Sequence, residues 1–187
     1  MSDTPLSELL LDAPIIAAVK NDDGLQRALS SRCAVIFLLY GTVCSIGSLA
    51  EQIKSHNRQV FIHLDLVDGL ASRDIAVDFI RRNTPADGII STRQNIIRRG
   101  RECGLTTIQR CFVHDSLALA NILRQPTDAD FIDILPGTIP KTIRRLAQSV
   151  RRPLIASGLL TEKEDVLSAL GAGAIAVSAT TPELWFL

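Results

Sequence analysis

Short apolar runs alternate with amphipathic stretches along nearly the whole chain. Runs such as AVIFLL at 34–39 and VFIHLDL at 60–66 are apolar at almost every position, which is typical of strands covered on both faces. The stretches between them space apolar residues three and four apart, as helices with one buried face do. The pattern predicts strands at 15–19, 34–39, 60–66, 88–91, 106–112, 131–135, 154–156 and 174–177. It predicts helices at 22–29, 45–55, 75–83, 92–103, 116–124, 140–150 and after Thr161, and a short terminal helix from Pro182.

Regular strand–helix alternation implies parallel strands joined by right-handed crossovers. Eight such units predict an α/β fold of the (β/α)8 TIM-barrel type, built as one domain over 1–187. The chain of 187 residues is shorter than the ~200 usual at the lower end for such barrels, so its loops must be short. An open flavodoxin-like sheet is the alternative.

The last two units carry the strongest local signals. Thr161 and Glu164 have the spacing of a capping box, and Val166, Leu167 and Leu170 form the apolar stripe of the helix that follows. The strands on either side of this helix end in small or hydroxylated turns, which contain Gly158 and Ser178-Ala179-Thr180. Such turns allow backbone N–H groups to face an anion, and the phosphate site of these barrels often lies after the last two strands. Two ordinary strand–helix loops would give the same pattern.

Composition narrows the class of protein. Lys plus Arg and Asp plus Glu both number 20, so a net charge of zero gives no global attraction to nucleic acid or anionic lipid. No apolar run approaches the ~20 residues that span a membrane. The N-terminus is acidic and lacks signal-peptide features, and the four scattered cysteines contain no CxxC pair. These features predict a cytoplasmic protein with reduced thiols.

Polar residues recur where the predicted strands end, which is the functional end of such a barrel. The candidate ligand-binding residues are Lys20, His63, Asp65, Arg93, Arg110, Asp133, Gly137, Gly158, Ser178, Ala179 and Thr180. His63 and Asp65 are two apart and should lie on one side of the third strand. Each also has a structural interpretation: His63 as a hydrogen-bonded core histidine, and Asp133 as an internal partner of Arg110. Taken together, cations and acids at one end suit a small polar anion, and arginine suits phosphate.

His63 and Asp65 offer two metal ligands, but the sequence provides no evident third one. We therefore predict no metal site. The low aromatic content, with six Phe, one Tyr and one Trp, counts against single-strand binding of the OB-fold kind.

Several strings resemble the glycerol uptake operon antiterminator family. They are HLDL (63–66), GIISTR (88–93), IQR (108–110), DFIDILPG (130–137), GLLTEKEDV (158–166) and AVSATTPELW (176–185). The resemblance runs from about Ile15 to Trp185 with order and spacing kept. It implies a small barrel that binds the effector sn-glycerol 3-phosphate and acts on leader mRNA of glycerol-metabolism genes, preventing termination and favouring transcript stability. It implies no cofactor and no enzymatic activity. Lys20 stands where the family carries Arg, which keeps the charge but not the bidentate fork.

Two further function classes remain beside the ligand-gated RNA-binding regulator. One is a barrel enzyme acting on a small phosphorylated polyol or sugar, with His63 or Asp65 as general base and Arg93 and Arg110 stabilising charge. The other is a partner protein with a purely structural role. Substrate turnover abolished by Asp65→Asn would identify the enzyme.

RNA binding by a neutral chain needs a local basic patch. Arg81 and Arg82 close one predicted helix, and Arg98, Arg99 and Arg101 lie on the next, so these five are the candidate RNA-binding residues. A second cluster contains Lys141, Arg144, Arg145, Arg151 and Arg152. For either cluster alone, solvated helix faces are the simpler explanation. The sequence does not distinguish a monomer from a homodimer.

Overall fold

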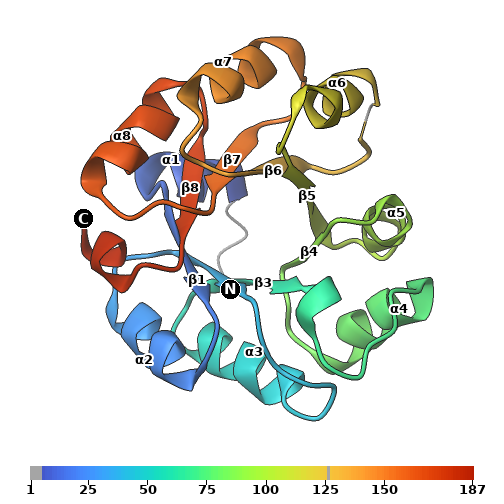
Figure 1. The fold of residues 1–187 in the computed structure, drawn as a ribbon. Coiled ribbons are helices and arrows are strands. Elements are labelled where there is room, and N and C mark those ends of the chain that lie inside the picture. The colour runs from blue at the N-terminus through green and yellow to red at the C-terminus, as the bar shows by residue number, and fades with distance from the viewer. Residues whose placement is uncertain (1–5, 126) are drawn as a thin grey trace.

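Eight parallel strands close into a barrel in the computed structural model, which describes residues 6–125 and 127–187 (Figure 1). In order around the barrel they are β1 (Ile15–Val19), β2 (Val35–Leu38), β3 (Gln59–His63), β4 (Gly88–Ser91), β5 (Thr106–Phe112), β6 (Phe131–Leu135), β7 (Leu154–Ser157) and β8 (Ala176–Ala179). Pairing of Ile15 with Val177 joins β1 to β8 and completes the ring. The predicted (β/α)8 barrel is confirmed, and the open sheet is excluded.

Helices form the outer ring around these strands (Figure 1). They are α2 (Asp22–Ser30), α3 (Ile46–Ser55), α4 (Asp74–Asn83), α5 (Gln94–Glu102), α6 (Ser116–Arg124), α7 (Pro140–Ser149) and α8 (Lys163–Gly171). The unit after β8 is a 3-10 helix, η2 (Pro182–Phe186), so the barrel is completed with a reduced eighth helix. Asn21 and Asp115 cap α2 and α6 by accepting hydrogen bonds from backbone N–H groups. No helix among the described residues is long and apolar enough to cross a membrane.

A helix that the periodicity did not predict, α1 (Leu6–Asp12), lies behind the strands in Figure 1. Its Leu6 and Leu10 are buried in the same cluster as the inward-facing side chains of the barrel, such as Ile16, Phe37 and Phe61. The rings of Phe37 and Phe61 lie 5.9 Å apart between centroids. The barrel interior is therefore filled by apolar side chains towards the amino ends of its strands.

Four local predictions need correction. The third strand ends at His63, and Asp65 lies in the 3-10 turn η1 (Leu64–Leu66) that follows it. The capping box of α8 is formed one residue later than predicted, by Glu162 and Asp165. The last strand also lies later, at Ala176–Ala179, because Ala174 and Ile175 complete the preceding turn.

The fourth correction concerns the buried face of α8. It is formed by Val166 and Ala169, with Leu170 partly buried against them, whereas Leu167 is exposed. The helix starts one residue later than predicted, and alanine contributes to the stripe that larger side chains were expected to form.

Candidate functional site

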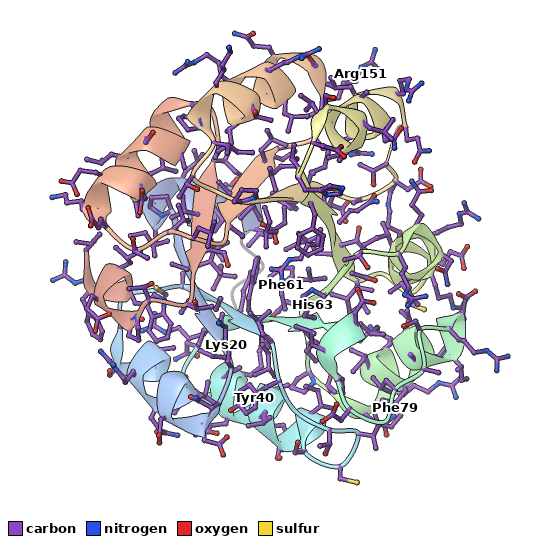
Figure 2. All side chains as sticks on the ribbon, in the orientation of Figure 1. Lys20, Tyr40, Phe61, His63, Phe79 and Arg151 are labelled. Atoms are coloured by element: carbon purple, nitrogen blue, oxygen red, sulfur yellow. The ribbon has the colours of Figure 1, made fainter. Side chains whose placement is uncertain are left out.

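The barrel interior changes from apolar to polar towards the carboxyl ends of the strands. Side chains two positions apart on a strand face the same way. Each apolar residue that faces the barrel interior is therefore followed, two positions later, by another inward-facing residue. After Phe61, Ile108, Phe131, Ile155 and Ala176, that residue is His63, Arg110, Asp133, Ser157 and Ser178 respectively. All five are buried. We call this set the polar layer, and Figure 2 labels Phe61 and His63 side by side within the ring of strands.

A buried ion pair forms the centre of the polar layer. Arg110 Nε donates to Asp133 Oδ2 at 2.8 Å, with the side chains 8% and 0% exposed. Ser157 Oγ donates to the other carboxylate oxygen of Asp133. Both oxygens of Asp133 are thus held by protein donors, whereas the two terminal nitrogens of Arg110 have no hydrogen-bond partner in residues 6–125 and 127–187. We infer that Asp133 orients Arg110 and that Arg110 is the group available to a ligand.

His63 is the second polar side chain with an unused atom. Its Nδ1 is buried without a hydrogen-bond partner among the described residues. Nδ1 lies 4.0 Å from Asp65 Oδ2, but burial and the nearby Arg110 charge lower the pKa of His63 to about 4, against the smaller opposing effect of Asp65. The imidazole is therefore neutral at pH 7, and its contact with Asp65 is not an ion pair there.

Asp65 holds the loop that follows β4. Its Oδ1 accepts from Ser91 Oγ at 2.9 Å, and its Oδ2 accepts from Thr92 N at 2.8 Å and Thr92 Oγ1 at 3.0 Å. The exposed Arg93 follows directly, with Nε 4.0 Å from Asp65 Oδ1. Asp65 therefore lies beside His63, as the sequence indicated, but from a 3-10 turn, and most of its hydrogen-bonding capacity serves the fold.

The two glycines of the predicted site connect neighbouring loops. Gly137 N donates to Gly158 O at 3.0 Å, which ties the turn after β6 to the turn after β7. Gly158 has φ +77°, in the left-handed region that suits glycine. The backbone N–H groups of Gly158 and Thr180 have no acceptor among the described residues. They are free at the end of the barrel where the polar layer lies.

The remaining predicted residues lie around the same barrel end. Lys20 and Thr180 line one hollow of about 280 Å³ between β1 and η2. Ala179 is buried at the end of β8, and its carbonyl accepts from Trp185 Nε1 at 2.9 Å. Ser178 Oγ has no hydrogen bond within the described part of the chain. The structure therefore gathers all the sequence-predicted ligand residues at the carboxyl ends of the strands.

Sequence reasoning missed one member of the polar layer, Ser157. It stands two positions after Ile155, so strand alternation alone would have placed it inward. No three His, Cys, Asp or Glu side chains of the described residues are arranged to hold a metal ion.

The five arginines predicted to bind RNA lie on α4 and α5, which contact one another. Three of them are used within the protein. Arg99 pairs with Asp78 at 2.7 Å and Glu102 at 3.0 Å, Arg101 donates to Asp128 O, and Arg81 donates to Cys103 O. Only Arg82 and Arg98 have no direct partner among the described residues.

A closed ring of eight parallel strands defines a small (β/α)8 barrel protein, and its unused polar groups form a candidate site at the barrel end where this fold usually has one. The sequence model of the glycerol-3-phosphate responsive antiterminators matches residues 15–185. The chain belongs to this family.

Two solved structures agree with this assignment, and a third relative is similar over nearly its whole length. The crystal structure of a glycerol uptake operon antiterminator regulatory protein from Listeria monocytogenes matches with a TM-score of 0.87 and 33% identity, over 93% of this chain and 95% of that one. An antiterminator-related protein from Thermotoga maritima matches with a TM-score of 0.79 and 26% identity, over 91% and 96%. The uncharacterised protein YgcP of Escherichia coli is 40% identical over 98% of this chain and 97% of its own length.

Barrel enzymes also share the fold. Orotidine 5'-phosphate decarboxylase from Pyrococcus horikoshii matches with a TM-score of 0.65 at 16% identity, over 88% of each chain. Similarity at that identity extends to the fold alone.

Proposed function

We propose that this protein is a glycerol-3-phosphate-responsive regulator that binds leader mRNA of glycerol-metabolism genes and prevents transcription termination. The observation that carries the proposal is the set of unused groups at one barrel end: the Arg110 guanidinium, His63 Nδ1, Ser178 Oγ and the N–H groups of Gly158 and Thr180. A phosphate needs several donors and a cation, and a glycerol moiety needs hydroxyl partners, so this set matches both halves of the ligand.

The phosphate is proposed to lie between the turns after β7 and β8. There the N–H groups of Gly158 and Thr180 face it, and Lys20, Arg93 and Arg110 supply positive charge. The glycerol hydroxyls then meet His63 and Ser178, with Asp65 close by. All four cysteines are free, which agrees with a cytoplasmic protein whose thiols stay reduced.

Binding is favoured over proton-transfer catalysis by the pKa of His63. A general base works best when its pKa is near the working pH, whereas His63 has a pKa of about 4. Asp65, the other candidate base, already accepts three hydrogen bonds. If the purified protein converted glycerol 3-phosphate and Asp65→Asn abolished the conversion, the regulator proposal would be rejected in favour of a barrel enzyme.

Gly158→Val should remove the response to ligand. A Cβ at this position would meet Leu135 Cδ2 at 3.3 Å, and the branched side chain would occupy the approach to the backbone amide. Wild-type protein at a hundredfold excess of glycerol 3-phosphate over its dissociation constant should gain about 2.7 kcal/mol in unfolding free energy, and the variant should gain almost none. The measurement is thermal and urea unfolding with and without glycerol 3-phosphate.

Gly104→Val is the matched control. Gly104 has φ +73°, and a Cβ there would meet no atom within 4 Å, so the variant has the same left-handed backbone strain away from the site. It should lose stability but keep the full ligand response. Equal ligand responses in the two variants would exclude the turn after β7 as the phosphate site.

The regulator proposal itself is tested by paired titrations of leader transcript and glycerol 3-phosphate. Saturating glycerol 3-phosphate should tighten RNA binding by about 5–150-fold, and RNA should tighten glycerol 3-phosphate by the same factor, because a coupling free energy is reciprocal. Inorganic phosphate serves as the control effector. RNA affinity that is independent of glycerol 3-phosphate would contradict ligand gating.

A further inference from the structure

A hollow of about 610 Å³ lies between the carboxyl ends of α6 and α7, at the opposite end of the barrel from the polar layer. Its apolar lining is formed by Ile122 and Leu123 of α6, Ile132 of β6 and Val150 after α7. We call it the α6–α7 hollow. Helix α6 has no fully buried residue, so its apolar side chains remain partly open on this side. The volume falls within the range of about 300–1,000 Å³ that is usual for sites that enclose small organic groups.

Three arginines line the α6–α7 hollow, and their charge is not neutralised locally. Arg151 and Arg152 make no ion pair or hydrogen bond to the part of the chain that the structure describes, and Figure 2 shows Arg151 between α6 and α7. Arg124 is bonded only to neutral groups, Ala120 O at 3.3 Å and Asn121 Oδ1 at 2.9 Å. None of the described lining residues is acidic. The hollow therefore combines an apolar floor with uncompensated positive charge.

The surrounding sequence extends this charge. Between 122 and 152, the segment that contains every described lining residue, there are six cations and three acids, giving a local balance of +3. Asp133 is buried in its pair with Arg110. In a chain of zero net charge, this segment concentrates positive charge on one side of the molecule.

The arginine patch on α4 and α5 has fewer unpaired cations available for RNA phosphates. Arg99 already pairs with two carboxylates, and Arg101 Nε lies 3.9 Å from Asp130 Oδ1. Binding a phosphate there would require these internal partners to be released, at a cost that the α6–α7 hollow avoids.

We infer that the α6–α7 hollow is the RNA-binding surface, and that it takes single-stranded RNA. The inference rests on the proposed function for the choice of RNA as the polyanion. Arg124, Arg151 and Arg152 contact phosphates, and an unpaired base lies against the apolar floor. The described lining has no aromatic side chain, so the base packs on aliphatic groups and does not stack on a ring as in an OB-fold. Base faces are accessible in single strands but stacked in duplexes, so the apolar floor selects unpaired RNA.

The test measures binding of two fluorescently labelled RNAs, the leader transcript and a random-sequence single strand of about 30 nucleotides, at several salt concentrations. Each lost phosphate contact should flatten the log–log salt dependence by about 0.7. Arg151→Ala should therefore flatten it by about 0.7 and Arg151→Ala/Arg152→Ala by about 1.4. The double variant should bind about 25-fold more weakly at 0.1 M salt.

Arg32→Ala is the charge-matched control for the single variant, because Arg32 is exposed in the loop before β2 and lines neither surface. It should bind like the wild type. Arg151→Lys/Arg152→Lys, which keeps the charge, should retain most of the salt dependence. Circular dichroism of each variant checks that the barrel is intact.

The outcomes separate the inference from the proposed function. Loss of binding in Arg82→Ala/Arg98→Ala with unchanged binding in the Arg151/Arg152 double variant would overturn the inference and assign RNA to α4 and α5. Tighter binding of duplex than of single-stranded RNA would also overturn it. Failure of the wild type to bind either RNA would instead reject the proposed function.

Discussion

Asp133→Leu should lower the free energy of unfolding by about 3–5 kcal/mol. The substitution leaves Arg110 buried without its carboxylate partner, and it removes the acceptor of the Ser157 hydroxyl. An uncompensated buried charge is among the largest effects that a single substitution produces. Urea denaturation of the purified variant measures the loss.

The double variant Arg110→Met/Asp133→Leu is the control for this prediction. Replacing both members of a buried ion pair by apolar residues is often neutral or stabilising, so the double variant should regain most of the stability. It should still fail to respond to glycerol 3-phosphate, because the cation proposed to meet the ligand is gone. A loss below about 1 kcal/mol in Asp133→Leu would mean that water compensates Arg110.

Acidification should destabilise the protein through His63. Its pKa is about 4 in the folded protein and about 6.5 in the unfolded chain. Between these values the unfolded chain binds more protons, so stability is retained above pH 6.5 and lost as the pH falls towards 4. The contribution of His63 to unfolding free energy between pH 7 and pH 4 is about 3 kcal/mol.

Urea denaturation across this pH range measures the effect. His63→Gln, which cannot titrate, should remove the His63 part of the slope. His114→Gln, which replaces a histidine whose side chain is 74% exposed, is the matched control. The groups that face His63 are Arg110 of β5 and Asp65 of η1. Identical pH slopes in wild type and His63→Gln would show that the imidazole is solvated or paired in the native state.

The barrel could be predicted from the sequence because the same pattern, an apolar strand followed by an amphipathic helix, recurs along the chain. Each strand is buried on both faces, so the runs at 34–39 and 131–135 are apolar throughout, and helices with a 3.6-residue period separate them. The number of units then determined the closed ring. Errors arose where periodicity is ambiguous: the string HLDL continues the apolar run of β3, although the chain turns into η1 after His63.

Helix α1 escaped prediction because it is only seven residues long and packs at one end of the barrel. It therefore shows no long apolar stripe, and only Leu6 and Leu10 are buried. Its role depends on tertiary packing against Ile16 and Phe37, which no local pattern reveals.

The candidate site could be predicted in position but not in the division of roles. Strand alternation placed His63, Arg110 and Asp133 at one barrel end. Which of their atoms remain available depends on contacts between strands: Ser157 and Arg110 use both oxygens of Asp133, and Ser91 and Thr92 engage Asp65. The availability of the arginines on α4 and α5 also depends on tertiary contacts, since Asp78 of α4 pairs with Arg99 of α5.

Strand β6 joins the two surfaces within two consecutive residues. Ile132 faces outward into the α6–α7 hollow, and Asp133 faces inward to hold Arg110. Natural selection acting on either surface must therefore act on the same five-residue strand, and mutations there should be pleiotropic. For RNA bound in the α6–α7 hollow, recognition would change slowly along β6 and faster at Arg124, Arg151 and Arg152, which lie outside the strand.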